Sequence, residues 1–97
     1  METLVYKIAE RKEFEAAMGA GRFNGAPVDL ADGFIHFSTA WQLRETGRRH
    51  FATADDLILV AVETAVLGDA LKYEPSRGGD LFPHLYGPMP TSCVAWT

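Results

Sequence analysis

Two histidine-bearing segments carry most of the chemistry that this sequence offers. In DGFIHFST, His36 stands two positions before Ser38. In FPHLYG, His84 stands two positions before Tyr86. Side chains alternate across an extended strand, so each histidine shares a face with the hydroxyl that follows it. An imidazole beside a hydroxyl can both donate and accept hydrogen bonds, which suits a ribose, a base or a phosphate.

The first segment predicts a strand over Phe34–Ser38 that leads directly into a helix beginning at Thr39. If Ile35 and Phe37 face the core, His36 and Ser38 open together onto a cleft. The start of a helix has free N–H groups and a partial positive charge, so an anion could bind beside them.

Structural roles compete with this interpretation. Thr39 and Gln42 fit the S/T-x-x-E/Q capping box, in which both side chains satisfy backbone N–H groups at a helix start. His36 on its own is also compatible with a hydrogen-bonded structural histidine. The first segment therefore predicts either a ligand site or a capped strand-to-helix junction.

The second segment is stiffened by its prolines. Pro83 restricts the residue before it, and Gly87 allows a tight bend next to Pro88. Such a segment would hold His84 and Tyr86 rigidly, with the Tyr86 ring as a flat surface for a base or a nicotinamide. The alternative is a plug that covers the core, in which His84 bonds to a backbone carbonyl.

Metal and nucleophile chemistry find little support. His36, His50 and His84 have no metal-ligand spacing, so we expect no metal. Ser38 lacks the G-x-S-x-G elbow, and Cys93 lies in an apolar strand, where a thiol stays protonated. Among the carboxylates, Glu63 and Glu74 are both available for general acid or base work, and no pairing signature distinguishes them.

The elements that must position these residues follow from the hydrophobic pattern. We expect a half-buried strand over Thr3–Ile8 with Leu4, Tyr6 and Ile8 on one face, and a helix over Glu10–Ala20 that Gly21 ends. Turns should fill residues 22–33, and the helix from Thr39 should turn Leu43, Gly47, His50 and Phe51 inward. After these we expect a central strand over residues 56–63, a helical turn over Leu67–Leu71 and a short strand over Leu71–Glu74. The chain should then form a long packed loop over Pro75–Pro90 and end in a strand over Ser92–Trp96.

Composition limits the class of protein. The 97 residues, 47% of them hydrophobic, predict a single α+β domain over residues 1–97. A net charge of −4 argues against general nucleic-acid binding, although Arg44, Arg48 and Arg49 could meet one or two phosphates of a small ligand. With one cysteine, no signal-like start and no apolar run near the roughly 20 residues of a membrane span, we expect a cytoplasmic protein without membrane contact.

Taken in order, VYKI, DGFIHFSTAWQ, DLILVAVE and GGDLFPHLYGPM resemble the domain-of-unknown-function 952 family of small bacterial proteins. The resemblance covers essentially the whole chain. That family is in turn similar to the ADP-ribosyltransferase superfamily, which implies a small α+β fold with a split, twisted, mainly antiparallel sheet and two main helices. The order of elements is similar to that of the RNA 2′-phosphotransferase branch, where a histidine-and-serine strand is followed by a helix and an aliphatic strand.

The resemblance implies NAD or a related nucleotide as substrate and the transfer or cleavage of ADP-ribose. His36, Ser38, Thr39, His84 and Tyr86 would then contact the nucleotide, with His36, His84 and Glu74 as the catalytic candidates. This sequence departs from the pattern, because the first strand offers Tyr6 and Lys7 where better-known transferases have His or Arg. The glutamate motif before a late strand also has no clear match. Two alternatives therefore stay open: a non-catalytic nucleotide-sensing or protein-binding module, and hydrolysis of another small phosphorylated or glycosidic molecule.

Overall fold

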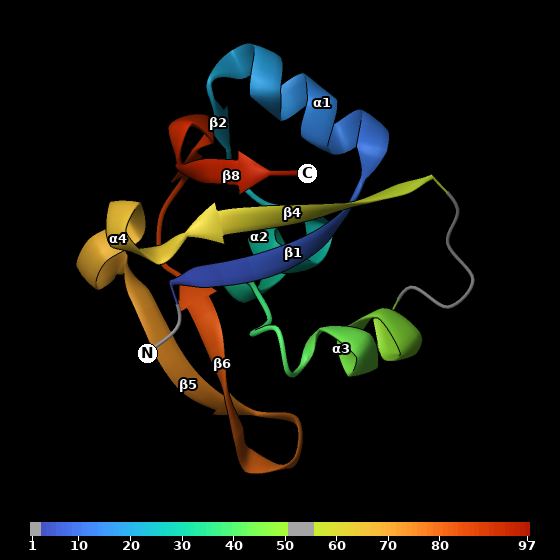
Figure 1. The fold of residues 1–97 in the computed structure, drawn as a ribbon, viewed down its shortest axis with the longest axis vertical. Helices are drawn as coiled ribbons and strands as arrows, with labels where there is room; N and C mark the ends of the chain where they lie inside the picture. The colour runs from blue at the N-terminus through green and yellow to red at the C-terminus, as the bar shows by residue number, and fades with distance from the viewer. Residues whose placement is uncertain (1–2, 51–55) are drawn as a thin grey trace.

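The first sheet is built on two long antiparallel strands. A computed structural model describes residues 3–50 and 56–97 of the chain. In it, β1 (Leu4–Glu10) pairs with β4 (Leu57–Glu63), and β8 (Val94–Trp96) lies on the other edge of β4 (Figure 1). Val60, Ala61 and Val62 of β4 are 0% exposed, which confirms the prediction of a central strand buried on both faces.

The buried face of β1 corrects the sequence interpretation. Val5, Lys7 and Ala9 are its buried residues, whereas Tyr6 and its neighbours on the apolar-looking face are only half buried. Alternation was therefore right, but a lysine occupies the inner side. Burial of Lys7 requires a charged partner, since an isolated ammonium is very costly to remove from water.

The segment predicted as a long loop over Pro75–Pro90 is mostly a β-hairpin. Strand β5 (Leu71–Ser76) turns through η2 (Arg77–Gly79) into β6 (Asp80–Leu85), and β3 (Ile35–His36) pairs with the far side of β6. Prolines argued against a strand because they lack an N–H. Pro83 keeps its carbonyl, however, and this oxygen accepts the Phe37 N–H at 2.9 Å.

A bridge between Tyr6 and Ser38 joins the two sheets. Each backbone N–H donates to the other residue's carbonyl at 2.8 Å. Beyond this bridge, a third short ladder pairs β2 (Arg22–Phe23) with β7 (Met89–Pro90). The bridge places β1 beside the strand that carries His36.

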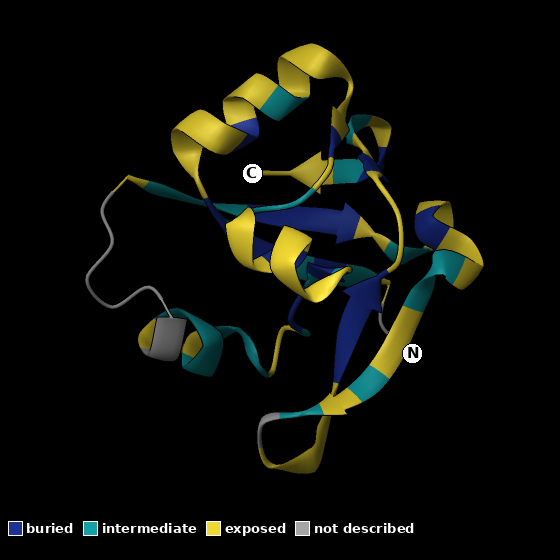
Figure 2. Ribbon diagram, turned by 180° about the vertical axis from the view of Figure 1, so that it is seen from behind, coloured by how far each residue is buried: buried dark blue, intermediate teal, exposed yellow. Residues whose placement is uncertain are grey.

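The segment over residues 22–33, predicted as turns, contains β2 and a helix, α2 (Pro27–Asp32). Pro27 is at the first helical position, where a missing N–H costs nothing. Asp29 at the third position accepts the Ala26 N–H at 2.7 Å and so caps the helix. Within α2 the buried residue is Asp29, and Figure 2 shows most of the other residues of this helix as exposed.

Helix α1 (Arg11–Ala20) confirms the first predicted helix. It buries Phe14 against Phe23, with ring centroids 5.7 Å apart, and ends at Gly21, whose φ of 86° is a left-handed conformation that favours glycine. Short helical segments also follow β4 in the chain: α4 (Thr64–Leu67), η1 (Gly68–Ala70) and, just before β8, η3 (Thr91–Cys93). The last strand is therefore two residues shorter than predicted.

The second predicted helix begins later than expected. Helix α3 spans Leu43–His50 rather than beginning at Thr39. Thr39 and Gln42 still make both bonds of the predicted capping box, at 3.0 and 3.3 Å, but these close a turn in front of the helix. Of the inward stripe, Phe51 and the side chain of His50 lie outside the described residues.

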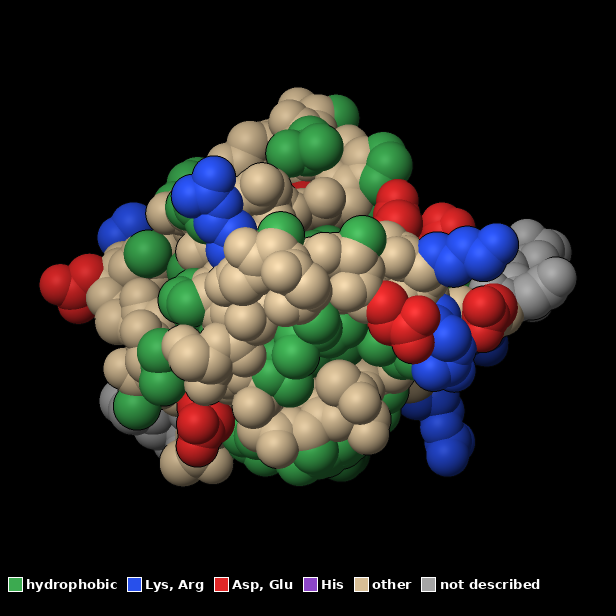
Figure 3. Space-filling model, turned by 90° about the horizontal axis from the view of Figure 1, so that it is seen from above, with side chains coloured by type: hydrophobic (Ala, Val, Ile, Leu, Met, Phe, Trp, Pro, Cys, Tyr) green, Lys and Arg blue, Asp and Glu red, His purple; other side chains and the backbone are tan. Residues whose placement is uncertain are grey.

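The architecture is α+β with antiparallel sheets, as predicted. The core draws its buried residues from both larger sheets and from Phe14 of α1, while most of α1 is exposed (Figure 2). Seen from above, acidic and basic side chains lie next to each other on the surface rather than in separate areas (Figure 3). Within residues 3–50 and 56–97, no helix has the length and apolarity to cross a membrane.

Candidate functional site

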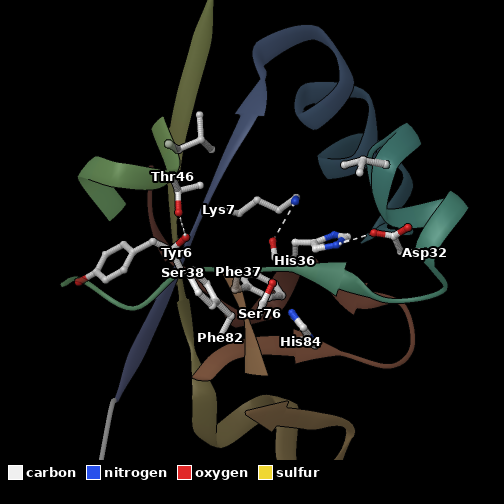
Figure 4. A pocket seen from close by; sticks show the side chains of 12 residues that line it. Tyr6, Lys7, Asp32, His36, Phe37, Ser38, Thr46, Ser76, Phe82 and His84 are labelled. Carbon is white, nitrogen blue, oxygen red and sulfur yellow. Dashed lines mark hydrogen bonds and ion pairs between the residues drawn. The ribbon is translucent and has the colours of Figure 1, made fainter. Parts of the chain in front are cut away.

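A cleft of about 290 Å³ lies where β1, α2, α3 and the β5–β6 hairpin meet (Figure 4). Its walls come from residues far apart in sequence, and most of their accessible surface is apolar. The lining residues are Tyr6, Lys7, Ile8, Val28, Asp32, His36, Phe37, Ser38, Thr46, Ser76, Phe82 and His84.

Both histidine segments reach this cleft, as predicted from the sequence. His36 of β3 stands directly opposite His84 of β6 in the strand pairing, which puts their side chains on the same face. Their ring centroids are 5.6 Å apart in an edge-to-face arrangement. Ile35 and Phe37, on either side of His36 in the chain, are buried in the core as expected, although Phe37 also lines the cleft.

The His36 ring is held between two carboxylates of α2. Its Nδ1 lies 2.6 Å from Asp29 Oδ1. Its Nε2 lies 2.9 Å from Asp32 Oδ2, the contact drawn in Figure 4. The backbone N–H of His36 also donates to Asp29 Oδ1 at 3.1 Å. A ring with protons on both nitrogens donates to both carboxylates, whereas a neutral ring donates to one.

Asp29 links His36 to the buried Lys7. The Lys7 Nζ lies 3.0 Å from Asp29 Oδ2 and donates to the His36 carbonyl at 2.9 Å. Burial opposes the charged form of Asp29, but bonds from His36, Lys7 and the Ala26 N–H lower its pKa to about 2. Burial lowers the pKa of Lys7, against the opposing effect of Asp29. The pair thus satisfies two charges whose removal from water is costly.

The second histidine has its own carboxylate, Glu74, which is not among the residues that line the cleft. His84 Nδ1 lies 2.8 Å from Glu74 Oε1, and the Tyr86 hydroxyl donates to the same oxygen at 2.7 Å. These bonds lower the pKa of Glu74 and raise the pKa of Tyr86, because both favour the carboxylate beside a neutral phenol. Glu74 and Tyr86 therefore contact His84 and each other but do not line the cleft.

Phe34 forms the aromatic support behind both histidines. Its ring stacks on the His84 ring at 4.1 Å and lies 4.6 Å from the His36 ring, measured between centroids. The Tyr86 ring packs on the same phenylalanine at 5.2 Å. The predicted role of Tyr86 as a flat surface for a ligand base is thus not supported by its position, since it packs on Phe34 outside the cleft lining.

Of the hydroxyls predicted for the site, Ser38 lines the cleft and Thr39 does not. Ser38 is buried and its Oγ lies 2.6 Å from the Thr46 Oγ1 on α3 (Figure 4). Thr39 belongs to the turn that Gln42 closes, and the Gln42 amide donates to the Leu81 carbonyl at 2.8 Å, tying this turn to the hairpin.

Four important residues were missed by the sequence reasoning: Lys7, Asp29, Asp32 and Phe34. Asp29 and Asp32 lie one helical turn apart, but the segment around them was interpreted as turns, so their common face was not considered. A lysine in the middle of an alternating apolar strand was the available signal for Lys7, because an inward lysine implies a buried acid.

The depressed pKa of Asp29 predicts a loss of stability in acid. A carboxyl with a lowered folded-state pKa stabilises the fold above its unfolded pKa, and this contribution is lost as the pH falls through the folded value. The window therefore runs from about pH 4 to pH 2, and the contribution of Asp29 is about 2 kcal/mol. Urea unfolding of wild type and Asp29→Asn at pH 5, 4, 3 and 2 measures it. The variant should lose less stability across this range, and equal losses would contradict the assignment.

Comparison with known proteins gives a family and a solved structure. A family model described as "Protein of unknown function (DUF952)" matches residues 8–97. An X-ray crystal structure of protein CC0527 from Caulobacter crescentus is 52% identical with a TM-score of 0.93, and the match covers 97% of this chain and 82% of that one. The solution NMR structure of CC0527 is 52% identical with a TM-score of 0.85, covering 98% and 82%. No curated protein matches this chain.

Proposed function

This chain belongs to the DUF952 family, which is described only as proteins of unknown function, and we therefore propose a function from the geometry of the cleft. The cleft binds NAD or a related nucleotide by its nicotinamide–ribose end. The observation that carries this proposal is the convergence of His36 and His84 on one cleft. Two rigidly held imidazole rings whose centroids are 5.6 Å apart can contact neighbouring groups of one small ligand, and His84 Nε2 can accept a hydrogen bond from it.

The size of the cleft supports partial burial of such a ligand. Its volume of about 290 Å³ is at the lower end of the roughly 300–1,000 Å³ typical of ligand pockets. This suits one ring with its sugar, while the rest of a dinucleotide would lie outside. Phe82 and Tyr6 add aromatic surface to the walls, and Ser38 and Thr46 add hydroxyls.

Charge also favours the nicotinamide end over the phosphates. Lys7 and Asp32 are the lysine and carboxylate of the lining, and the Lys7 ammonium is already paired with Asp29. Phosphates would gain little here and would meet the acidic Asp32, whereas a positively charged ring would be attracted to it. Arg44, on α3, is a candidate for phosphates outside the cleft.

The same cleft could support ADP-ribosyl transfer or cleavage. The bond between nicotinamide and ribose would break, and its electron pair would leave with nicotinamide. A hydroxyl of the acceptor, or water, would then attack the ribose carbon and lose its proton to His84. Asp32, the carboxylate of the lining, would stabilise the positive charge that develops on the ribose. In this proposal His36 and His84 contact the ligand, and Glu74 acts through His84.

A non-catalytic nucleotide-sensing module is the alternative that one observation favours. Asp32, the carboxylate among the described lining residues, is already hydrogen-bonded to His36, so the described cleft offers no carboxylate without a partner. Such a module would bind the nucleotide and return it unchanged.

Calorimetry and thermal-shift measurements with NAD, ADP-ribose, nicotinamide and mononucleotides test the proposal. A ligand at 100 times its dissociation constant should raise the free energy of unfolding by about 2.7 kcal/mol. Chromatography of the same mixtures then shows whether nicotinamide is released, which separates the enzyme from the sensor. If none of these compounds raises the unfolding temperature, the proposed function is wrong.

His84→Asn is the variant that tests the cleft directly. The asparagine amide can still donate to Glu74, as Nδ1 does, but the ring atom that faces the cleft is removed. We expect about tenfold weaker nucleotide binding, measured by calorimetry, with Lys12→Gln on the exposed face of α1 as the control. Unchanged affinity in a folded His84→Asn protein would exclude His84 from the binding site.

A further inference from the structure

The bonds around Glu74 fix the direction in which His84 meets the cleft. Glu74 is a carboxylate with a lowered pKa, and an ionised carboxylate can only accept hydrogen bonds. Its Oε1 lies 2.8 Å from His84 Nδ1, so the Nδ1 atom must carry a proton. In the neutral ring, Nε2 then has a lone pair and no proton.

The His84 ring lines the cleft. His84 is 5% exposed, and Nε2 makes no hydrogen bond to any residue within 3–50 and 56–97. In the same part of the chain no fully buried side-chain nitrogen or oxygen lacks a partner. Nε2 is therefore not fully buried, and because His84 lines the cleft (Figure 4), we infer that this atom opens onto it.

His36 has the opposite character. Both of its ring nitrogens are bonded to carboxylates, Nδ1 to Asp29 and Nε2 to Asp32, so no lone pair of this ring is open to the cleft. The two histidines are close together, but only His84 offers an acceptor. The two rings therefore differ: His84 Nε2 can accept a hydrogen bond from a ligand, whereas both nitrogens of His36 are already bonded to Asp29 and Asp32.

We propose that Glu74 is a positioning residue which sets the tautomer of His84, so that the cleft selects ligands presenting a hydroxyl donor to His84 Nε2. Tyr86 assists by donating to the same Glu74 oxygen and fixing the carboxylate. This inference rests on the proposed nucleotide function, in which a ribose hydroxyl is the donor. It explains why a residue outside the cleft would control what the cleft binds.

The tautomer can be measured without any ligand. In ¹⁵N-labelled protein at pH 8, the histidine ring ¹⁵N shifts and long-range N–H couplings report which nitrogen is protonated. We expect wild-type His84 to be protonated at Nδ1. Glu74→Met should shift the ring toward the other tautomer, because the acceptor is lost. Glu74→Gln should restore the wild-type spectrum, because its amide oxygen still accepts from Nδ1.

Ligand selection is the second measurement. Nicotinamide mononucleotide is compared with its 2′-deoxy and 3′-deoxy analogues in wild type, Glu74→Met and Glu74→Gln, with Glu15→Gln on α1 as the control. In wild type, one deoxy analogue should bind about three- to tenfold more weakly than the parent, and Glu74→Met should abolish this difference. Glu74→Gln and the control should preserve it.

The outcomes separate the two proposals. A wild-type His84 protonated at Nε2 overturns the positioning role of Glu74, whatever binds. The expected tautomer with equal binding of all three nucleotides overturns hydroxyl selection while leaving nucleotide binding intact. The expected tautomer with no binding of any nucleotide refutes the proposed function and the ribose assignment together, but not the role of Glu74 in orienting His84.

Discussion

Asp29→Ala is expected to destabilise the protein by about 3–5 kcal/mol, far more than the loss of a solvent-exposed charge pair costs. The substitution leaves the Lys7 ammonium, which is 7% exposed, without its charged partner. It also removes the acceptor for the His36 backbone N–H and ring, and for the Ala26 N–H that begins α2. Urea unfolding at pH 7, followed by circular dichroism, measures the loss.

A paired substitution identifies the cause. Burial lowers the pKa of Lys7 against the effect of Asp29, so the ion pair does not fully offset the cost of taking this ammonium out of water. Lys7→Met combined with Asp29→Leu removes both charges and should recover a large part of the loss. If the double variant is as unstable as the sum of its single variants, the unpaired charge is not the cause.

Phe37→Ala is expected to cost about 3–5 kcal/mol, because a large buried ring is replaced by a cavity. Phe37 is 3% exposed, belongs to the core cluster and also lines the cleft. Its loss should therefore weaken nucleotide binding as well as the fold. Thermal and urea unfolding measure stability, and calorimetry below the unfolding temperature measures binding.

Trp41→Ala is the matched control for this experiment. Trp41 lies four residues further along the chain but is 95% exposed, so its replacement should change the free energy of unfolding by no more than about 0.5 kcal/mol. Similar losses in the two variants would show that burial is not what distinguishes these aromatic residues.

Alternation was the most reliable guide from sequence to site. It predicted that Ile35 and Phe37 are buried and that His36 reaches the cleft, because the spacing of side chains along a strand is fixed by backbone geometry. The meeting of His36 with His84 was expected from their chemistry. The structure adds the reason, since the two residues are directly opposed in one antiparallel pair.

Pairings between distant segments were beyond the reach of the sequence. The proline content predicted a loop, but β5 and β6 form a hairpin. Pro83 fits there because Phe37 needs only its carbonyl oxygen as an acceptor, and the sequence alone does not show this contact. The Asp29–Lys7 pair joins residues 22 positions apart in the chain. Either charge alone is typical of a solvated surface, and the burial of both depends on their contact together with the bonds that Asp29 makes to His36 and Ala26.

Helix α2 contacts the rest of the molecule through its acidic residues and exposes its apolar ones, so we expect these two sets of positions to tolerate substitution differently. Asp29 and Asp32, one turn apart, make the bonds to His36, while Val28 and Leu30 are exposed and leave the packing of the core unaffected. Substitutions at the acidic positions would disturb the charge network and the histidine together. Val28, which borders the cleft, can change more freely, so related proteins could alter the width and polarity of the cleft entrance while keeping the same ionic framework beneath it.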